Sequence, residues 1–269
     1  MADATFDRSR FLAALHTRRF GRTLIARAEA GSTNDVAWEA LAGGGETGPA
    51  APDGTVVVAD AQPRGRGRAG RGWHVTPHRG LALSLLLTEG GDRGRARSLP
   101  LAAGLALARA LEALGLRADL KWPNDVLVGS RKLAGILCES RRTSGGDAVV
   151  IGLGVNVLDA AEDIPPELAE CATSLAIEGV RTTREAVAAG FLDALEPVWD
   201  AIRAQGAADM LGAWKRRAGF WGRTVTVRSA AGAITGVAHD LDRDGALILR
   251  LADGSDVTAL AGDVEPAAR

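Results

Sequence analysis

The chain has 269 residues, of which 46% are hydrophobic and 24% are charged, a composition typical of a folded globular protein. Its 32 Lys and Arg residues and 33 Asp and Glu residues leave a formal net charge of −1. This balance argues against a globally basic nucleic-acid binder, because such binding depends on an excess of Lys and Arg.

The cysteine count and the N-terminus indicate the compartment. Two cysteines, Cys138 and Cys171, are too few for a disulfide framework or for a zinc site built from cysteines alone. The first residues, MADATFDRSRFLAALHTRRF, contain no apolar core long enough for a signal peptide. No run of about 18 apolar residues is present, so we expect no membrane span. These features together predict a cytoplasmic protein without a membrane partner.

The first 219 residues mix helical and strand-like patterns without regular alternation, which favours an α+β fold. Ser32, Thr33 and Asn34 can cap one helix, and Pro197 is expected to kink another. In chain order we expect a helix over 8–20, a helix over 35–41, strands over 55–59 and 81–88, a helix over 99–114, strands over 118–122, 132–139 and 148–153, and helices over 184–204 and 208–218.

The pattern changes after Phe220. Short strands are expected over 224–228, 233–241, 247–251 and 256–259, and the pairs Asp244-Gly245 and Asp253-Gly254 are strong hairpin signals. The sequence therefore predicts a main domain over residues 1–219 and an all-β domain over residues 220–269. The second domain is too small to hold much core unless it packs against the first.

Residues 64–73, RGRGRAGRGW, form the strongest candidate for a functional segment, and we call them the glycine–arginine loop. Four glycines allow the backbone to approach a ligand closely, and the arginines between them suit a polyphosphate. The segment lacks the Lys-Ser/Thr ending of a P-loop and the spacing of a dinucleotide site. A solvated loop and an RNA-binding arginine–glycine tract are the alternatives, although such tracts lie in disordered regions rather than between two apolar strands.

Four further segments are weaker signals when each is taken alone. The segment KWPND ends a strand at Asn124 and Asp125, and Lys132 opens the next strand, KLAGIL, in which Gly135 indicates a close approach of backbone or ligand. The alternatives without a functional role are a turn for KWPND, a solvated surface lysine for Lys132 and a helix cap for the sequence GSTN at 31–34. The two glycines of GLGVNV, at 152–157, are also a weak signal alone.

The four histidines have no spacing typical of metal ligands, and no GxSxG motif or Cys/His dyad is present. Covalent nucleophilic catalysis is therefore unsupported. The remaining residue types indicate positioning and electrostatic stabilisation around a phosphate.

Taken in order, Ser-Thr-Asn at 32–34, GRGRAGRGW, KWPNDV, KLAGIL and GLGVNV resemble the motifs of biotin–protein ligases. The resemblance covers about residues 31–175, and residues 220–269 resemble the SH3-like C-terminal domain of that family. It implies a mixed β-sheet with flanking helices, as in class II synthetase-like catalytic domains, followed by a small SH3-like β-barrel. Ala69 and Gly72 stand where some relatives have further basic residues, which leaves the loop less charged.

The resemblance implies an AMP-forming ligase with two half-reactions. Biotin and ATP, with Mg²⁺, would form biotinyl-5′-AMP, and a lysine of a biotin carboxyl carrier domain of a biotin-dependent carboxylase would then accept the biotin. Only about 30 residues precede the Ser-Thr-Asn motif, too few for the winged-helix domain of some relatives, so no DNA binding is expected. A monomer or a weak homodimer is expected. A lipoate–protein ligase, which shares the fold, and a non-enzymatic nucleic-acid binder are the competing hypotheses.

The resemblance also assigns residue roles. Lys132, Arg68 and Asp125 would be catalytic: Lys132 and the loop arginines would gather carboxylate and phosphates, and Asp125 would orient the acceptor amine. The loop would be mobile without ligand, and apolar walls for biotin would come from strands 133–137 and 151–155. The metal ligands stay unassigned. Residues expected to bind biotin, ATP or the adenylate are Ser32, Thr33, Asn34, Gln62, Gly65, Arg66, Gly67, Arg68, Arg71, Trp73, Lys121, Asn124, Lys132, Gly135 and Asn156.

Overall fold

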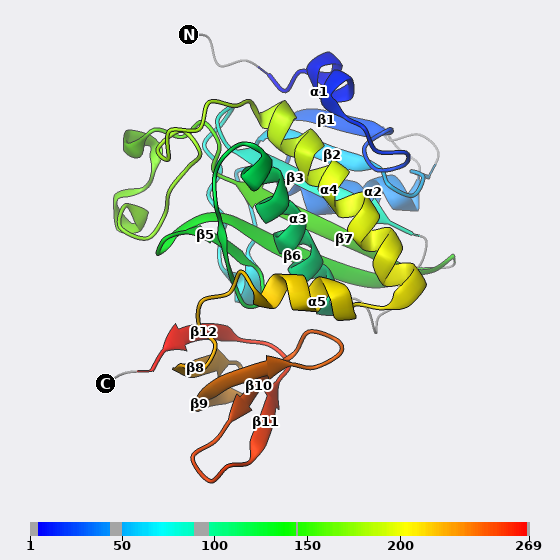
Figure 1. Cartoon of the computed structure of the whole chain (residues 1–269). Coiled ribbons are helices and arrows are strands. Elements are labelled where there is room, and N and C mark those ends of the chain that lie inside the picture. Colours follow the sequence, from blue (N-terminus) through cyan, green and yellow to red (C-terminus); the bar gives the residue numbers. More distant parts are fainter. Residues whose placement is uncertain (1–4, 44–49, 89–96, 144, 268–269) are drawn as a thin grey trace.

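A computed structural model describes residues 5–43, 50–88, 97–143 and 145–267 (Figure 1). Its centre is a seven-stranded sheet with the order β1-β2-β3-β7-β6-β5-β4, in which β1 and β2 are parallel and the other neighbours are antiparallel. The strands are β1 (Leu24–Glu29), β2 (Val56–Ala61), β3 (Leu81–Leu87), β4 (Asp119–Lys121), β5 (Asp125–Val128), β6 (Arg131–Thr143) and β7 (Gly146–Val155). The predicted mixed sheet is therefore confirmed.

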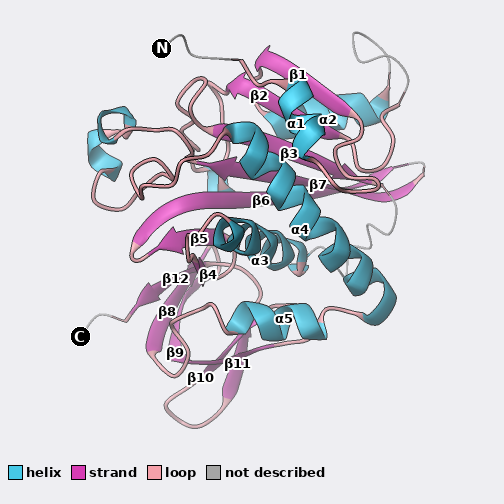
Figure 2. Cartoon of the chain, turned by 45° about the horizontal axis from the view of Figure 1, so that its top comes forward, coloured by secondary structure: helices cyan, strands magenta, loops and turns pink. Residues whose placement is uncertain are grey.

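Helices lie on both faces of this sheet (Figure 2). They are α1 (Arg8–Ala14), α2 (Thr33–Ala42), α3 (Leu99–Ala113), α4 (Arg184–Gln205) and α5 (Ala208–Lys215), with short 3₁₀ turns η2 (Arg68–Gly70), η4 (Ala161–Asp163) and η5 (Pro166–Leu168). Helix α4 continues through Pro197. In the described part of the chain, no helix is both long and apolar enough to cross a membrane.

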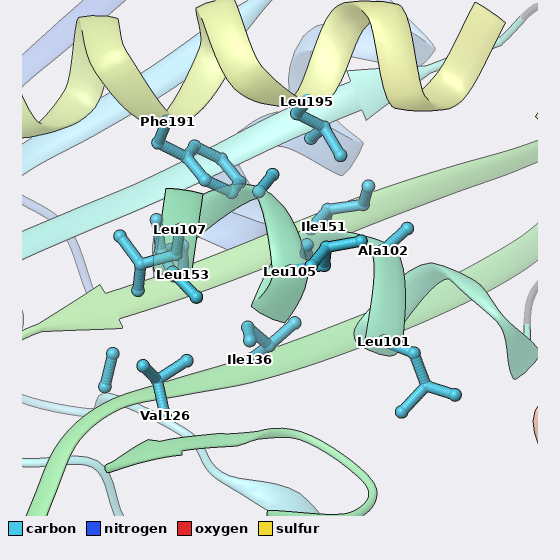
Figure 3. Close-up of a cluster of buried hydrophobic side chains, with 14 of the residues drawn as sticks. Leu101, Ala102, Leu105, Leu107, Val126, Ile136, Ile151, Leu153, Phe191 and Leu195 are labelled. Carbon is cyan, nitrogen blue, oxygen red and sulfur yellow. The ribbon is translucent and has the colours of Figure 1, made fainter. Parts of the chain in front are cut away.

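Strand alternation assigns each face of the sheet to different helices. In β3, Leu85 belongs to the large core under α3 and α4, whereas Leu86 belongs to a smaller cluster with Trp38 of α2. Successive side chains of a strand point to opposite faces, so α2 covers the face opposite α3 and α4. All seven residues of β3 are buried, which explains the uninterrupted apolar run in its sequence. Figure 3 shows the large core, where Phe191 and Leu195 of α4 lie over the side chains of α3 and the sheet.

Two sequence predictions about elements are corrected by the structure. The first helix ends at Ala14 rather than Phe20, because the backbone N–H groups of Arg18, Arg19 and Phe20 donate to Glu196 of α4 instead of continuing the helix. Strands β1 and β5 were not predicted. Strand β1 is an edge strand with charged residues, and β5 begins inside the KWPND segment, where the proline suggested only a turn.

The C-terminal part is a separate five-stranded antiparallel sheet with the order β11-β10-β9-β8-β12 (Figure 1). It confirms the predicted small β-domain and adds one strand, β12, which was not predicted. Its strands are β8 (Thr224–Ser229), β9 (Gly232–Leu241), β10 (Leu247–Arg250), β11 (Asp256–Ala259) and β12 (Asp263–Pro266). Gly245 and Gly254 have positive φ in the predicted turns.

The two sheets touch near the motif segments. The indole of Trp122, in KWPND, is buried and donates a hydrogen bond of 3.0 Å to the carbonyl of Gly245. Gly245 packs so closely that a Cβ there would lie 2.7 Å from Leu101 of α3. The C-terminal sheet therefore supports the KWPND segment directly.

Candidate functional site

The floor of the site is a pair of glycines on neighbouring strands. Gly135 of β6 and Gly154 of β7 are partners in register, and Trp73 lies against both. A Cβ at Gly154 would be 2.2 Å from Trp73 Nε1, and one at Gly135 would be 3.0 Å from the same ring. The ring also lies 5.4 Å from Lys132 Nζ. Glycine is required at these positions because only a bare backbone leaves room for the indole.

One end of the site is a buried polar network around the start of α2. Gln62 Oε1 accepts hydrogen bonds from the backbone N–H of Thr33 at 2.9 Å and from its hydroxyl at 3.2 Å. Ser84 donates to Asn34 Oδ1 at 2.6 Å, and the Ser84 and Thr33 hydroxyl oxygens are 2.8 Å apart. Asn34 fills the space above Gly152, where a Cβ would lie 2.4 Å away. These fixed amide and hydroxyl groups suit a small polar ring.

Ser84 is a member of this network that the sequence prediction missed. It is fully buried, and it is the one polar residue inside the run LALSLLL of β3. A buried hydroxyl needs a hydrogen-bond partner, so its position in an apolar strand was the available signal.

The glycine–arginine loop folds back on itself beside the floor. The backbone N–H of Gly67 donates to the carbonyl of Arg71 at 2.7 Å, and that of Trp73 donates to the carbonyl of Gly65 at 2.9 Å. A Cβ at Gly65 would lie 2.3 Å from the Trp73 carbonyl oxygen, so this glycine lets the two ends of the loop pack against each other. At the tip, Ala69 and Gly70 both have positive φ, in turn η2.

Three of the four arginines in the loop, Arg66, Arg68 and Arg71, bond to other protein groups in the structure. Arg66 makes a two-pronged pair with Asp35 at 2.5 and 2.7 Å, which holds the pKa of that carboxyl below its usual value. Arg68 donates to Asn124 Oδ1 at 3.0 Å, and Arg71 donates to Asp263 Oδ1 at 3.0 Å. Burial lowers the pKa of Arg68, but arginine stays protonated at neutral pH.

The remaining charged residues gather at the other end of the floor. Lys132 Nζ lies 2.7 Å from Asp125 Oδ1, and Asp125 is the register partner of Gly135. Asn124 Nδ2 donates to the carbonyl of Ile136 at 2.8 Å, which fixes the corner that presents Asp125. A lysine beside a carboxylate can exchange that partner for a ligand carboxylate or phosphate.

These groups line two adjoining pockets, which share Arg71, Gly72, Trp73 and Lys132. The first, with a volume of about 140 Å³, extends from the polar network to the loop arginines, and the second has a volume of about 360 Å³. The first pocket contains the predicted residues Ser32, Thr33, Asn34, Gln62, Arg66, Gly67, Arg68, Arg71, Trp73, Asn124, Lys132 and Gly135. The second contains Lys121, Asp125 and Asn156.

Two details differ from the sequence prediction. Gly65 lines neither pocket and instead lies at the base of the loop, next to Gln62. Ile151 and Val155 belong to the core under α3 and α4, whereas Ile136, Leu137 and Leu153 line the first pocket, so the two predicted apolar strands supply part of its wall. In β7, Gly152 and Gly154 alternate with the core residues and form the floor of the site, on which Trp73 is the large apolar surface.

The site can hold an elongated molecule with unlike ends. Buried hydroxyl and amide groups occupy one end, the Trp73 ring lies in the middle, and Lys132, Arg68 and Arg71 occupy the other end. Such a pocket favours a ligand with a polar head, an apolar body and an anionic tail that reaches phosphates.

Known proteins with similar sequences and structures are described as biotin protein ligases. Residues 33–156 match the Biotin/lipoate A/B protein ligase family, and residues 220–265 match the biotin protein ligase C-terminal domain. The chain is 36% identical over 253 residues to the biotin–[acetyl-CoA-carboxylase] ligase of Mycobacterium tuberculosis, covering 90% of this chain and 88% of that protein. It is 34% identical over 243 residues to the bifunctional ligase/repressor BirA of Bacillus spizizenii, covering 89% and 73%.

A solved structure of the biotin protein ligase from Aquifex aeolicus, in complex with biotin and ATP, superimposes with a TM-score of 0.76. Its sequence is 28% identical to this chain, and the alignment covers 91% of this chain and 98% of that one.

Proposed function

Since this chain belongs to the biotin protein ligase family, we propose that it uses ATP to attach biotin to a specific lysine of a biotin carboxyl carrier domain. The observation that carries this proposal is the first pocket. It joins the buried Ser32–Asn34 network, the Trp73 ring and the cations Arg68, Arg71 and Lys132 in one continuous lining. Biotin has a matching order of parts, a ureido ring, an apolar body and a carboxylate.

Binding of the ureido ring is assigned to the polar network. Hydroxyl and amide groups of Ser32, Thr33 and Asn34 would meet its N–H and C=O groups, and Gln62 and Ser84 hold Thr33 and Asn34 in place. The ring of Trp73 would cover the apolar body. This placement directs the carboxylate toward Lys132.

In the first step, a carboxylate oxygen of biotin attacks the α-phosphorus of ATP, and the bond to the β,γ-diphosphate breaks. The products are biotinyl-5′-AMP and pyrophosphate. Arg68 and Arg71 would offset charge on the departing pyrophosphate, and Lys132 would hold the carboxylate and α-phosphate oxygens in line. Lys132 leaves its pair with Asp125 as it does so.

In the second step, the ε-amine of the acceptor lysine attacks the acyl carbonyl of biotinyl-5′-AMP, and AMP leaves. The amine must lose a proton to become a nucleophile. Asp125, separated from Lys132 by the first step, lines the second pocket and would orient the amine and accept its proton.

Mg²⁺ was expected to accompany ATP. Among the described residues, no group of three or more His, Cys, Asp or Glu side chains could hold a metal ion. Mg²⁺ that enters with ATP is held mainly by phosphates and water with one or two protein carboxylates, so it needs no such group and its protein ligands stay unassigned. The steps above are assigned to Arg68, Arg71, Lys132 and Asp125.

The assignment of two domains, 1–219 and 220–269, the monomer or weak homodimer, and the cytoplasmic location stay predictions. The alternative of a lipoate ligase is favoured by one observation, the shared biotin/lipoate family match of residues 33–156. The alternative of an RNA-binding tract is disfavoured by the protein partners of Arg66, Arg68 and Arg71.

The test is the mass of a carrier domain after incubation with the enzyme, ATP and either biotin or lipoate. We expect the mass of one biotinyl group on the carrier, and biotin-dependent exchange of pyrophosphate into ATP. Modification with lipoate but not with biotin would support the lipoate ligase. The absence of both exchange and modification would support the nucleic-acid binder.

A further inference from the structure

A turn of the C-terminal sheet reaches the glycine–arginine loop of the catalytic part. Arg68 Nη1 donates to the carbonyl of Gly262 at 3.2 Å. Arg71 Nη2 lies 2.9 and 3.0 Å from the two carboxylate oxygens of Asp263, and Arg68 lies 3.7 Å from Oδ1 of that carboxylate. Two arginines of the substrate pocket are therefore held by residues about two hundred positions away in the chain.

The turn that makes these contacts is tightly built. Gly262 has a φ of +140°, and a Cβ there would lie 2.7 Å from the carbonyl oxygen of Arg228 and 2.6 Å from a methyl of Val227. Only glycine fits, so the direction of its carbonyl is set by the packing of β12 on β8. In the same strand pair, Arg228 bonds Glu265 at 2.9 Å, whereas the ion pairs of Asp263 in the described structure are with Arg68 and Arg71.

The contacts leave donors free for an anion. A guanidinium has five N–H donors, and the hydrogen bonds of Arg68 to Asn124 and Gly262 both use Nη1. Both arginines line the first pocket while one edge of each contacts the C-terminal sheet. Holding a glycine-rich loop in one conformation costs backbone entropy, and bonds that anchor its tip offset part of that cost.

We propose that Asp263 is a positioning residue that holds the glycine–arginine loop closed over the pocket, so that retention of the acyl-adenylate depends on the C-terminal sheet. This inference rests on the proposed function. If Asp263 positions the loop, removing its carboxylate speeds loss of the adenylate. If Asp263 instead competes with phosphates for the two arginines, removing it tightens ATP binding.

The experiment compares Asp263→Asn with a matched control, Glu265→Gln. The control removes the same charge two residues along β12, where the partner is Arg228 within the sheet. Asp263→Glu restores the charge. The readouts are the rate at which preformed biotinyl-5′-AMP leaves the enzyme without an acceptor, and the KM for ATP and kcat of pyrophosphate exchange.

We expect Asp263→Asn to release the adenylate roughly fivefold faster, the size expected for loss of a partly exposed ion pair. The kcat of exchange should change little, Glu265→Gln should match the wild type, and Asp263→Glu should recover most of the retention. An unchanged release rate, or a lower KM for ATP, in Asp263→Asn overturns the proposal.

A readout without substrate separates this inference from the proposed function. Trypsin cleaves after arginine, so cleavage within residues 64–72 of the intact protein reports how long the loop stays open. We expect faster cleavage in Asp263→Asn than in the wild type or Glu265→Gln, and equal rates contradict the role of Asp263 in holding the loop. If the wild type forms no adenylate but the cleavage rates differ, the proposed function fails while the role of Asp263 in holding the loop stands.

Discussion

Lys132 is the residue on which the proposed chemistry depends most directly. Its ammonium group lies 2.7 Å from Asp125 and faces the ring of Trp73, between the two pockets. We expect Lys132→Ala to lower biotin-dependent pyrophosphate exchange at least about 100-fold, because a preorganised cation near the transferring group is lost. The change is measured by exchange of labelled pyrophosphate into ATP. Near-normal exchange, with the fold intact by circular dichroism, would reject the assigned role.

The packing of Trp73 on Gly154 leads to a second prediction about a single residue. In Gly154→Ala the new methyl would lie 2.2 Å from Trp73 Nε1, so the indole must leave its place on the sheet. Biotin binding should weaken at least about tenfold, as an apolar contact surface is lost. Tryptophan fluorescence and calorimetric titration with biotin measure the two effects.

The control for that variant is Gly190→Ala in α4. A Cβ there meets only Ala110, at an ordinary 3.5 Å, and a helix favours alanine over glycine by up to about 1 kcal/mol. Stability should therefore stay equal or rise, and biotin affinity should not change. Normal biotin affinity in Gly154→Ala would show that the Trp73 position is irrelevant to binding.

Sequence reasoning reached the site residues whose types are chemically distinctive and whose motifs are local. Lys132, Arg68 and Asn34 are brought together as predicted around one pocket. Ser84 was missed because its one signal, a polar residue inside an apolar strand, does not say which groups its hydroxyl bonds. Asp263 was missed because its contact with the loop depends on how two sheets pack, which no short spacing in the sequence encodes.

Among the elements, the N-terminal segment and α4 depend on one buried carboxylate. Glu196, 5% exposed, accepts hydrogen bonds from the backbone N–H groups of Arg18, Arg19 and Phe20 at 2.7–3.0 Å. Burial opposes its ionisation, but these donors outweigh burial and hold the pKa of Glu196 below its ordinary value of 4.5. A charge-assisted network of this kind ends the first helix early and joins it to α4.

Glu196→Gln should lower the free energy of unfolding by about 1.5–3 kcal/mol at pH 7, the usual contribution of hydrogen bonds to a charged group. Because the folded pKa is lowered, this contribution is fully present above about pH 4.5 and is lost as pH falls through the folded value. Urea denaturation at several pH values measures the difference between variant and wild type. A difference that stays constant down to pH 3 would contradict the argument, and Glu265→Gln on the surface should cost less than about 1 kcal/mol.

The same segment shows why the elements were predicted unevenly. Long periodic stretches such as 99–114 and 184–204 were predicted nearly to their observed ends, α3 (Leu99–Ala113) and α4 (Arg184–Gln205). The helix over 8–20 was overextended, since its apolar spacing continues while tertiary hydrogen bonds to Glu196 end it. Strands β5 and β12 have four residues each and no Asp-Gly pair beside them, whereas the equally short β10 and β11 are flanked by Asp244-Gly245 and Asp253-Gly254.

For the whole molecule, the C-terminal sheet is joined to the catalytic part at the same places where the site is assembled. Trp122 of KWPND donates to Gly245, and the loop arginines contact Gly262 and Asp263. Aromatic residues fill the connection, where Trp221 lies 6.4 Å from Trp214 and 4.6 Å from Phe220. We call these contacts between the two sheets the seam. A substitution in the seam should therefore loosen both the C-terminal sheet and the site.

Trp122→Phe tests this coupling, because it removes the indole N–H that donates to Gly245 while keeping an aromatic ring. The lost hydrogen bond should cost about 1–2 kcal/mol and raise hydrogen exchange of β8–β10 amides roughly tenfold through local opening of the C-terminal sheet. Exchange in β3 and β7 should change much less. Trp38→Phe is the matched control. The indole of Trp38 donates a hydrogen bond of 2.8 Å to Glu139, and this bond lies away from the seam. Equal effects of the two variants on β8–β10, or a uniform increase over the whole chain after Trp122→Phe, would show that the seam does not hold the C-terminal sheet in place.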